Sequence, residues 1–273
     1  MIQWKMIKSI HFGGGAFAVI GYIGVLNYLE KVSAMDKSMT LSGTSAGAIF
    51  AFLMTIGLKS RDMLQLFTPD VLKVMIRLQK LTDFEKDGNL LNYSELWKKL
   101  HGVCAQQAYD FDTLTFQELY EASKTTLIIT GTCIQQSECE LFSHVLHPDM
   151  KIMKALEITT CIPLLLKPIQ YKEKFYVDGA ISDNCMFQKC DIIVGNNIDF
   201  NRNFLHNQHF DIIDYISNIV VALMSIVTNI RYKTDNCILI TSESFLPYFN
   251  SSSMLKMILD GYEKTELYFK KHT

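Results

Sequence analysis

The stretch from Leu41 to Ile49, with the sequence LSGTSAGAI, constrains the fold more than any other part of the chain. It is typical of a strand that ends in a sharp turn and continues into an apolar helix. Gly43 and Gly47 flank Ser45 at the two positions where side chains would collide in so tight a turn. This pattern, the nucleophile elbow, pushes a serine hydroxyl into a cleft beside the N-terminus of the following helix. The stretch therefore predicts an α/β fold with a serine placed for acyl transfer.

A run of three glycines, Gly13-Gly14-Gly15, stands between an apolar strand at 8–12 and a helix from about Ala16 to Lys31. Glycines in this position bring backbone N–H groups close to an anion. A dinucleotide loop would need a glycine where Ala18 stands, and a P-loop would need a Gly-Lys-Ser/Thr sequence that is absent. We therefore interpret Gly13, Gly14 and Gly15 as an oxyanion hole for Ser45, which explains both motifs together.

The rest of the chain alternates strands with helices, which predicts a mainly parallel sheet with helices on both faces. No repeat or flexible linker interrupts it, so we expect one domain over residues 1–273, with a helical insertion at about 60–124. Amphipathic helices are expected in that insertion at Ser60–Phe67 and Val71–Leu81, and capping boxes at Asn92 and Thr115. Further strands are predicted at Thr125–Cys133, Glu140–His144, Lys174–Val177, Asp191–Gly195 and Asn236–Thr241, with a closing helix at Ser251–Lys270.

Composition excludes several classes of protein. The net charge of −2 gives no reason to expect nucleic-acid binding, and 49% hydrophobic residues suit a folded core. Seven cysteines without a Cys-x-x-Cys pair favour reduced thiols in an intracellular, cytoplasmic setting. The first residues, Met1 to Lys8, are too short and too charged for a signal peptide. The apolar run Ile212–Ile230 carries polar residues on one face, which favours an amphipathic helix over a membrane span.

A serine nucleophile needs a base, and two arrangements are possible. Asp178 follows a predicted strand, at the end where α/β folds collect their ligands. Burial would raise its pKa from a reference value of about 3.9 and make direct proton transfer from Ser45 feasible. Alternatively, His206 or His209 could complete a Ser-His-Asp triad with Asp178 or Asp183, although both histidines lie in a polar stretch typical of an exposed loop.

Three cations, Lys73, Arg77 and Lys80, fall on one face of the predicted helix at Val71–Leu81. The simpler interpretation is a solvated helix face. The alternative is a basic face that contacts anionic lipid at a membrane surface.

Three motifs in order, Gly13-Gly14-Gly15, Gly43-Thr44-Ser45-Ala46-Gly47 and Asp178-Gly179-Ala180, resemble the signature blocks of the patatin-like phospholipases. The similarity covers most of residues 8–270 and is weakest at 60–110. Supporting sequences are Phe142-Ser143, His147-Pro148-Asp149, Ala155 to Ile162-Pro163, Asn184 and the tail Leu259-Asp260-Gly261-Tyr262.

The resemblance implies a three-layer α/β sandwich in which Ser45 is the nucleophile, Asp178 is its base, and Gly13 to Gly15 form the oxyanion hole. The implied reaction is hydrolysis of acyl esters in membrane phospholipids through an acyl-enzyme, without cofactor or metal. The chain departs from the family after the glycines, where Ala16-Phe17-Ala18 replaces a pattern that carries Arg or Lys at the position of Phe17. Two rival hypotheses follow, a Ser-His-Asp esterase of soluble esters and a non-catalytic lipid-binding relative.

Overall fold

The computed structural model describes residues 6–75, 77–78, 88–183, 190–198, 215, 219–220, 222–223, 226, 234–242 and 250–272. Its strands are β1 (Ile7–Phe12), β2 (Met35–Gly43), β3 (Arg77–Leu78), β4 (Leu91–Asn92), β5 (Thr126–Cys133), β6 (Glu138–Phe142), β7 (Ile169–Tyr171), β8 (Lys174–Asp178), β9 (Ile192–Ile198) and β10 (Cys237–Ser242). Its α-helices are α1 (Tyr22–Lys31), α2 (Ala46–Thr55), α3 (Ser60–Leu66), α4 (Pro69–Met75), α6 (Ser94–Gln106), α7 (Phe116–Ser123), α8 (Ile152–Thr159) and α10 (Ser251–Lys271). Two short 3-10 helices complete the set, η1 (Ala16–Gly21) and η2 (Gly179–Ile181).

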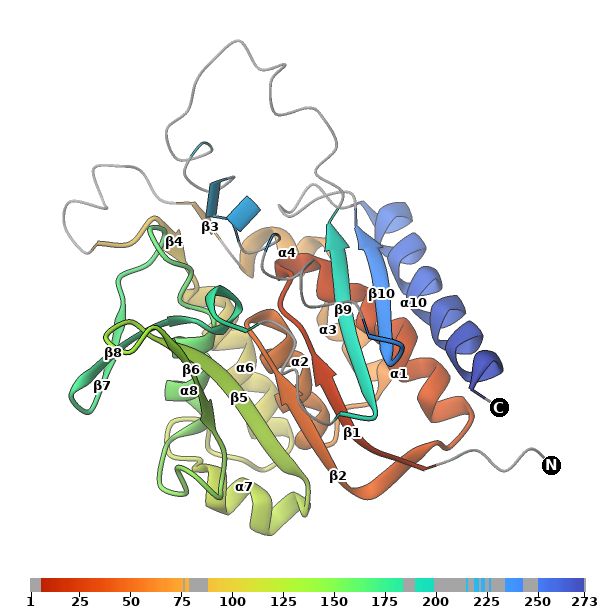
Figure 1. The fold of residues 1–273 in the computed structure, drawn as a ribbon, viewed down its shortest axis with the longest axis horizontal. Coiled ribbons are helices and arrows are strands. Elements are labelled where there is room, and N and C mark those ends of the chain that lie inside the picture. The colour runs from red at the N-terminus through yellow and green to blue at the C-terminus, as the bar shows by residue number, and fades with distance from the viewer. Residues whose placement is uncertain are drawn as a thin grey trace.

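The strands form a central sheet in the order β10-β9-β1-β2-β5-β8-β7, with β6 paired to β5 (Figure 1). Neighbouring strands from β10 to β5 run parallel. The three strands beyond β5 are antiparallel to their neighbours. The predicted mixed α/β class with a mainly parallel sheet is therefore confirmed.

Alternation along β1 and β2 gives the sheet an apolar face, on which Ile10, Phe12 and Leu41 are buried. Helix α2 packs against this face, and because it is apolar all round it is buried almost completely. Phe12 and Phe50 lie with their ring centroids 5.0 Å apart, and Tyr22 stands edge-on to Phe50 at 5.7 Å. This aromatic cluster fixes the start of α2, and hence the turn that precedes it, against the end of β1.

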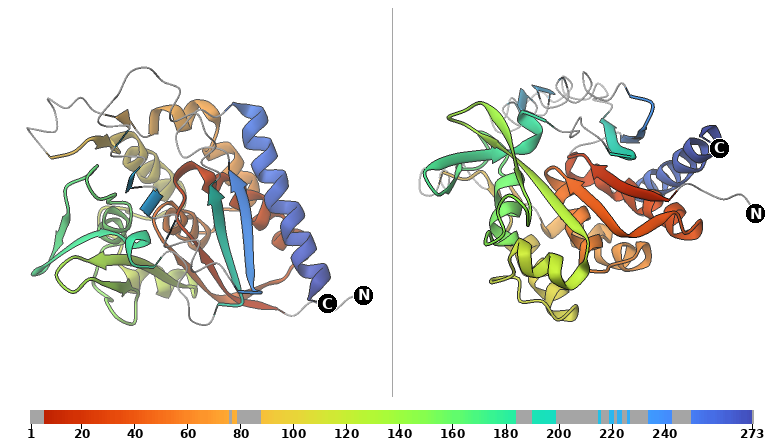
Figure 2. Two further views of the ribbon diagram at one scale, coloured as in Figure 1. Left: turned by 45° about the horizontal axis from the view of Figure 1, so that its top comes forward. Right: turned by 60° about the horizontal axis from the view of Figure 1, so that its bottom comes forward.

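Helix α10 packs against α1, η1 and β10, and Figure 2 shows it in blue along one edge of the sheet. Glycines permit this close approach. A Cβ at Gly261 would lie 2.1 Å from the carbonyl oxygen of Gly21, and a Cβ at Gly24 would lie 1.8 Å from that of Ile258. Because α10 packs onto the sheet in this way, the largest buried cluster includes residues from Ile7 near the N-terminus to Phe269 of α10. The organisation as a single domain stays a prediction.

The inserted segment differs from the prediction at its second helix. The expected helix Val71–Leu81 ends at Met75, and Arg77 instead pairs with Asn92 across β3 and β4. Antiparallel pairing there competes with a further helical turn, and it brings β3 to Leu91, which is buried among apolar neighbours. A shared helix face for Lys73, Arg77 and Lys80 is therefore wrong, and Lys80 lies outside the described residues.

The two predicted capping boxes also have different outcomes. Thr115 and Glu118 form one reciprocally at the start of α7. At α6, however, Asn92 accepts a hydrogen bond from the N–H of Ser94, two residues on, so that it forms a turn before the helix.

Other predictions fall largely or wholly on residues that the structure does not describe. The expected helix at Ile212–Ile230 is described only at scattered positions, and His206 and His209 are not described at all. Among the described residues, no helix combines the length and the apolar character that crossing a membrane requires.

Candidate active site

Ser45 occupies a strained turn between β2 and α2. Its φ of 54° and ψ of −130° are a conformation that non-glycine residues rarely adopt. The flanking glycines are sterically required, since a Cβ at Gly47 would lie 2.2 Å from the carbonyl oxygen of Phe12, and one at Gly43 would lie 2.5 Å from Cα of Ala48. The elbow predicted from the spacing is therefore the geometry that the chain adopts.

Two strands that do not pair with each other bring Ser45 and Asp178 together. On one side of β5, both Ile129 and Gly131 pair with β6. On the other side, Ile129 pairs with Gly43 at the end of β2, and Gly131 pairs with Asp178 at the end of β8. Strands β2 and β8 thus share one side of β5. Because β2 runs parallel to β5 and β8 runs antiparallel, their carboxyl ends point at each other.

The hydroxyl of Ser45 donates a hydrogen bond to Oδ2 of Asp178 at 2.6 Å. Oδ1 of Asp178 accepts from the N–H of Ala180 at 2.9 Å, and the N–H of Asp178 donates to the carbonyl of Cys161 at 2.8 Å. The N–H of Ser45 donates to Oγ1 of Thr159 at 2.8 Å. Both side chains are therefore held in place from several directions.

The carboxyl group of Asp178 is completely buried. Burial raises its pKa from 3.8 to about 7, because a charged carboxylate is poorly solvated there. The hydrogen bonds from Ser45 and from the N–H of Ala180 oppose this shift, since they stabilise the charged form. A carboxyl group that titrates near neutral pH can accept a proton from a hydroxyl far better than a solvated aspartate can.

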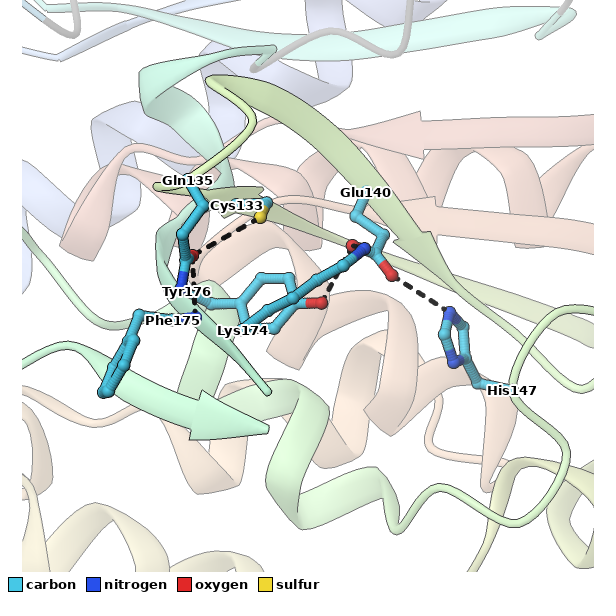
Figure 3. Close-up of polar contacts among 7 residues, drawn as sticks. All are labelled: Cys133, Gln135, Glu140, His147, Lys174, Phe175 and Tyr176. Carbon is cyan, nitrogen blue, oxygen red and sulfur yellow. Dashed lines mark hydrogen bonds and ion pairs between the residues drawn. The ribbon is translucent and has the colours of Figure 1, made fainter. Parts of the chain in front are cut away.

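Strand β8, which ends at Asp178, is fixed by a polar cluster around Glu140 of β6 (Figure 3). Oε2 of Glu140 accepts from the hydroxyl of Tyr176 at 2.8 Å and from Nζ of Lys174 at 3.0 Å. Its Oε1 lies 3.5 Å from Nε2 of His147. Tyr176 is buried two residues before Asp178, so this cluster sets the position of the strand end.

The glycine run lies against the elbow, as the N–H of Thr44 donates to the carbonyl of Phe12 at 3.0 Å. Within the run, the N–H of Gly13 donates to the carbonyl of Val194 at 2.8 Å, so this amide is already occupied. The carbonyl of Gly13 accepts from the hydroxyl of Tyr22. Phe17, where the family pattern has a cation, is buried in the apolar core and presents no charge to the site.

Two residues that sequence reasoning missed hold the site together. Oγ1 of Thr130 on β5 lies 2.7 Å from Oγ1 of Thr44, in the gap where β2 and β8 meet. Thr159 ends α8 and holds the N–H of Ser45. Neither threonine belongs to a local motif. Only Thr159 lies within a stretch, Ala155 to Pro163, that resembles the family.

Asp183 and three of the described histidines contact residues other than Ser45. Asp183 offers its backbone carbonyl, not its carboxylate, to Thr44, with Oγ1 and the oxygen 3.4 Å apart. Of the described histidines, His11 bonds to Ser42, His144 stacks on Tyr120 and His147 contacts Glu140. Within the described part of the chain, no cluster of His, Cys, Asp or Glu side chains is arranged to hold a metal ion.

Comparison with known proteins agrees with this geometry. Residues 10–190 match the family described as "Patatin-like phospholipase". The match spans all three motifs and most of the chain, so this protein belongs to the patatin-like phospholipase family.

Two viral proteins are similar in sequence. The "Probable lipid hydrolase 463L" of Invertebrate iridescent virus 6 is 30% identical over 183 residues, covering 66% of this chain and 62% of its own length. The "Uncharacterized protein R571" of Acanthamoeba polyphaga mimivirus is 24% identical over 187 residues, covering 66% of this chain and 60% of its own length. The alignments thus span less than two thirds of these relatives.

Two bacterial effectors share the fold. VipD from Legionella pneumophila superimposes with a TM-score of 0.61 at 14% identity, covering 97% of this chain and 67% of its own. The type III effector ExoU of Pseudomonas aeruginosa gives a TM-score of 0.55 at 15% identity, covering 98% of this chain and 53% of its own. At these identities the similarity concerns the fold alone.

Proposed function

We propose that this protein hydrolyses fatty-acyl esters of membrane phospholipids, with Ser45 as nucleophile and Asp178 as general base. The observation that carries the proposal is the 2.6 Å hydrogen bond from a serine on a strained elbow to a fully buried aspartate. Membership of the patatin-like phospholipase family and similarity to a protein named as a lipid hydrolase support the substrate class.

In the proposed reaction, Asp178 accepts the hydroxyl proton as the oxygen of Ser45 attacks the ester carbonyl. The tetrahedral intermediate collapses, the bond to the leaving alcohol breaks, and that alcohol takes the proton from Asp178. A water molecule then gives a proton to Asp178 and attacks the acyl-enzyme. Collapse of the second intermediate releases the fatty acid and returns the proton to Ser45.

The oxyanion would be stabilised by amides of the glycine run and of the elbow. Because the N–H of Gly13 is bonded to Val194, we assign this role to the amides of Gly15 and Ala46 and not to the amide of Gly13. The amide of Ala46 follows the nucleophile directly, and it belongs to the first turn of α2, where the helix dipole adds positive potential.

The substrate places the reaction at a membrane surface, which the protein would contact peripherally. Lys73, Arg77 and Lys80 do not share a helix face, because α4 ends at Met75 and Arg77 lies in β3. They therefore give no support for that contact. A cytoplasmic location stays a prediction from the cysteine content.

The test is a fluorophosphonate probe, which labels activated serines, combined with phospholipid hydrolysis by purified protein. Ser45→Ala should abolish labelling, and both Ser45→Ala and Asp178→Asn should lower hydrolysis by roughly 10³-fold or more. Ser143→Ala removes another buried serine and serves as the control, which should still be labelled. Labelling that survives in Ser45→Ala would rule out this nucleophile.

The histidine rival is tested in the same assay. His206→Ala and His209→Ala should keep wild-type activity if Asp178 is the base. A loss as large as that of Asp178→Asn would favour a Ser-His-Asp triad instead.

A further inference from the structure

A pocket of about 270 Å³ lies between the segment that leads into α6 and the loop that follows α8. Thr160 and Cys161 line it. The carbonyl of Cys161 accepts from the N–H of Asp178 at 2.8 Å, and the neighbouring Thr159 holds the N–H of Ser45. The segment from Thr159 to Cys161 therefore borders the pocket and contacts both Ser45 and Asp178.

Hydrogen bonds hold the two walls of the pocket together. The amides of Leu90 and Leu91 both donate to the carbonyl of Leu165, at 2.8 and 3.2 Å. The N–H of Lys167 donates to Oδ1 of Asn89 at 3.0 Å, and Sγ of Cys161 donates to the carbonyl of Lys167 at 3.2 Å. The pocket is thus formed before any ligand arrives, which lowers the entropic cost of binding.

The lining favours a polar ligand over an acyl chain. A site for a hydrocarbon chain is lined mainly by apolar side chains. Here two charged and three uncharged polar residues share the lining with two aromatic rings and four apolar residues: Lys167, Glu157, Asn89, Asn92, Thr160, Tyr93, Trp97, Leu91, Cys161, Leu166 and Ile169. Among the described residues, the ammonium of Lys167 has no carboxylate within ion-pair distance, so it is complementary to a phosphate.

The aromatic rings and a carboxylate lie at the same pocket. The rings of Tyr93 and Trp97 are nearly perpendicular, at 81°, with centroids 6.3 Å apart. Oε2 of Glu157 pairs with Lys154 at 2.5 Å, and its second oxygen makes no hydrogen bond to a described residue. Two ring walls at right angles beside a carboxylate are suited to a quaternary ammonium group.

We propose that this pocket binds the phosphocholine headgroup of the substrate lipid, a deepening that rests on the proposed function. Lys167 and the side-chain amide of Asn92 would contact the phosphate, and Tyr93, Trp97 and Glu157 would surround the trimethylammonium group. The headgroup would then lie next to the segment from Thr159 to Cys161, which contacts Ser45 and Asp178, with the ester directed towards Ser45.

The first experiment compares hydrolysis of phosphatidylcholine and phosphatidylglycerol with identical acyl chains in the same mixed micelles. Trp97→Ala should lower kcat/KM on phosphatidylcholine roughly two- to thirtyfold, the range that a cation–π contact provides, and leave phosphatidylglycerol unchanged. Lys167→Gln should lower kcat/KM on both lipids, because both carry the phosphate. Lys98→Gln, an exposed change on α6, is the matched control and should alter neither.

The second experiment does not need activity. Phosphocholine and inorganic phosphate are each titrated into Ser45→Ala protein by calorimetry, with Ser45→Ala/Trp97→Ala as the comparison. Phosphocholine should bind more tightly than phosphate, and the tryptophan change should abolish that difference. If soluble phosphocholine binds but no lipid is hydrolysed, the proposed function fails while the pocket assignment stands.

The reverse outcome also separates the two proposals. Hydrolysis that depends on Ser45 but shows no headgroup preference would leave the function intact and overturn the pocket assignment. A shift in acyl-chain preference in Trp97→Ala, without a headgroup effect, would assign the pocket to the acyl chain and overturn the proposal likewise.

Discussion

At the scale of the residue, the environment of Asp178 determines when the proposed enzyme is active. The base must be ionised to accept a proton, and burial raises its pKa to about 7. Activity should therefore fall as the pH drops below 7, whereas an ordinary aspartate would keep it constant down to about pH 4.

The pH profile tests this directly. The value of kcat/KM on a soluble short-chain ester should rise about tenfold per pH unit up to pH 7 and then level off. A soluble substrate removes any effect of pH on binding to lipid surfaces. A profile that is flat between pH 5 and pH 8 would contradict the assignment of Asp178 as a base with a raised pKa.

The same carboxylate should lower the stability of the protein. Its pKa is about 7 in the folded state and 3.8 in the reference state, so folded protein binds more protons between these values. Below pH 4 the carboxyl group of Asp178 is protonated in both states and does not destabilise the fold. As the pH rises towards and through 7, that stability is lost, because the buried group must then carry a charge.

Asp178→Asn removes this titration and keeps the shape of the side chain. The variant should gain free energy of unfolding relative to wild type at pH 8, on the order of a few kcal/mol, and gain little at pH 4.5. Urea denaturation at the two pH values measures the difference. An equal effect at both would show that the charge is not the cause.

At the scale of the element, glycines act differently according to what surrounds them. Gly261 of α10 faces the backbone of Gly21, while Gly102 of α6 has no atom within 4 Å of a Cβ position. Helix packing requires the first glycine, and nothing in the packing requires the second.

Alanine at each position separates these roles. Gly261→Ala should destabilise the protein by about 1–3 kcal/mol, because α10 must move away from α1 and η1. Gly102→Ala should stabilise it by about 0.5–1 kcal/mol, because alanine favours the helix. Chemical denaturation of both variants measures the contrast, and a neutral Gly261→Ala would show that α10 is not tightly packed.

Local patterns predicted the elements well where one interaction decides the outcome. The elbow at Ser45 follows from two glycines, and the capping box at Thr115 from one reciprocal pair. The helix predicted to reach Leu81 failed because its last turn competes with pairing to β4, a partner more than ten residues away that periodicity cannot reveal. Asn92 failed for a similar reason, since its side chain can cap a turn as readily as a helix.

At the scale of the whole molecule, the sequence predicted the class of fold and singled out Ser45 and Asp178 as candidates, but it did not show how the two residues meet. Ordered motifs named Ser45 and Asp178, while their contact depends on the registers of β2 and β8 along β5. The supports at Thr130 and Thr159 come from the same assembly, and no spacing along the chain encodes them. The occupied amide of Gly13 is likewise a consequence of its neighbour β9.

The head-on meeting of β2 and β8 has a consequence for how such a protein can diversify. Each strand end is held by β5, so the long excursion between α2 and β5 does not set the separation of Ser45 and Asp178. Insertions there that keep its buried core contacts would leave that separation unchanged. That excursion supplies Tyr93 and Trp97 to the proposed headgroup pocket, so under that proposal related proteins could differ in lipid preference and keep the same pair of Ser45 and Asp178.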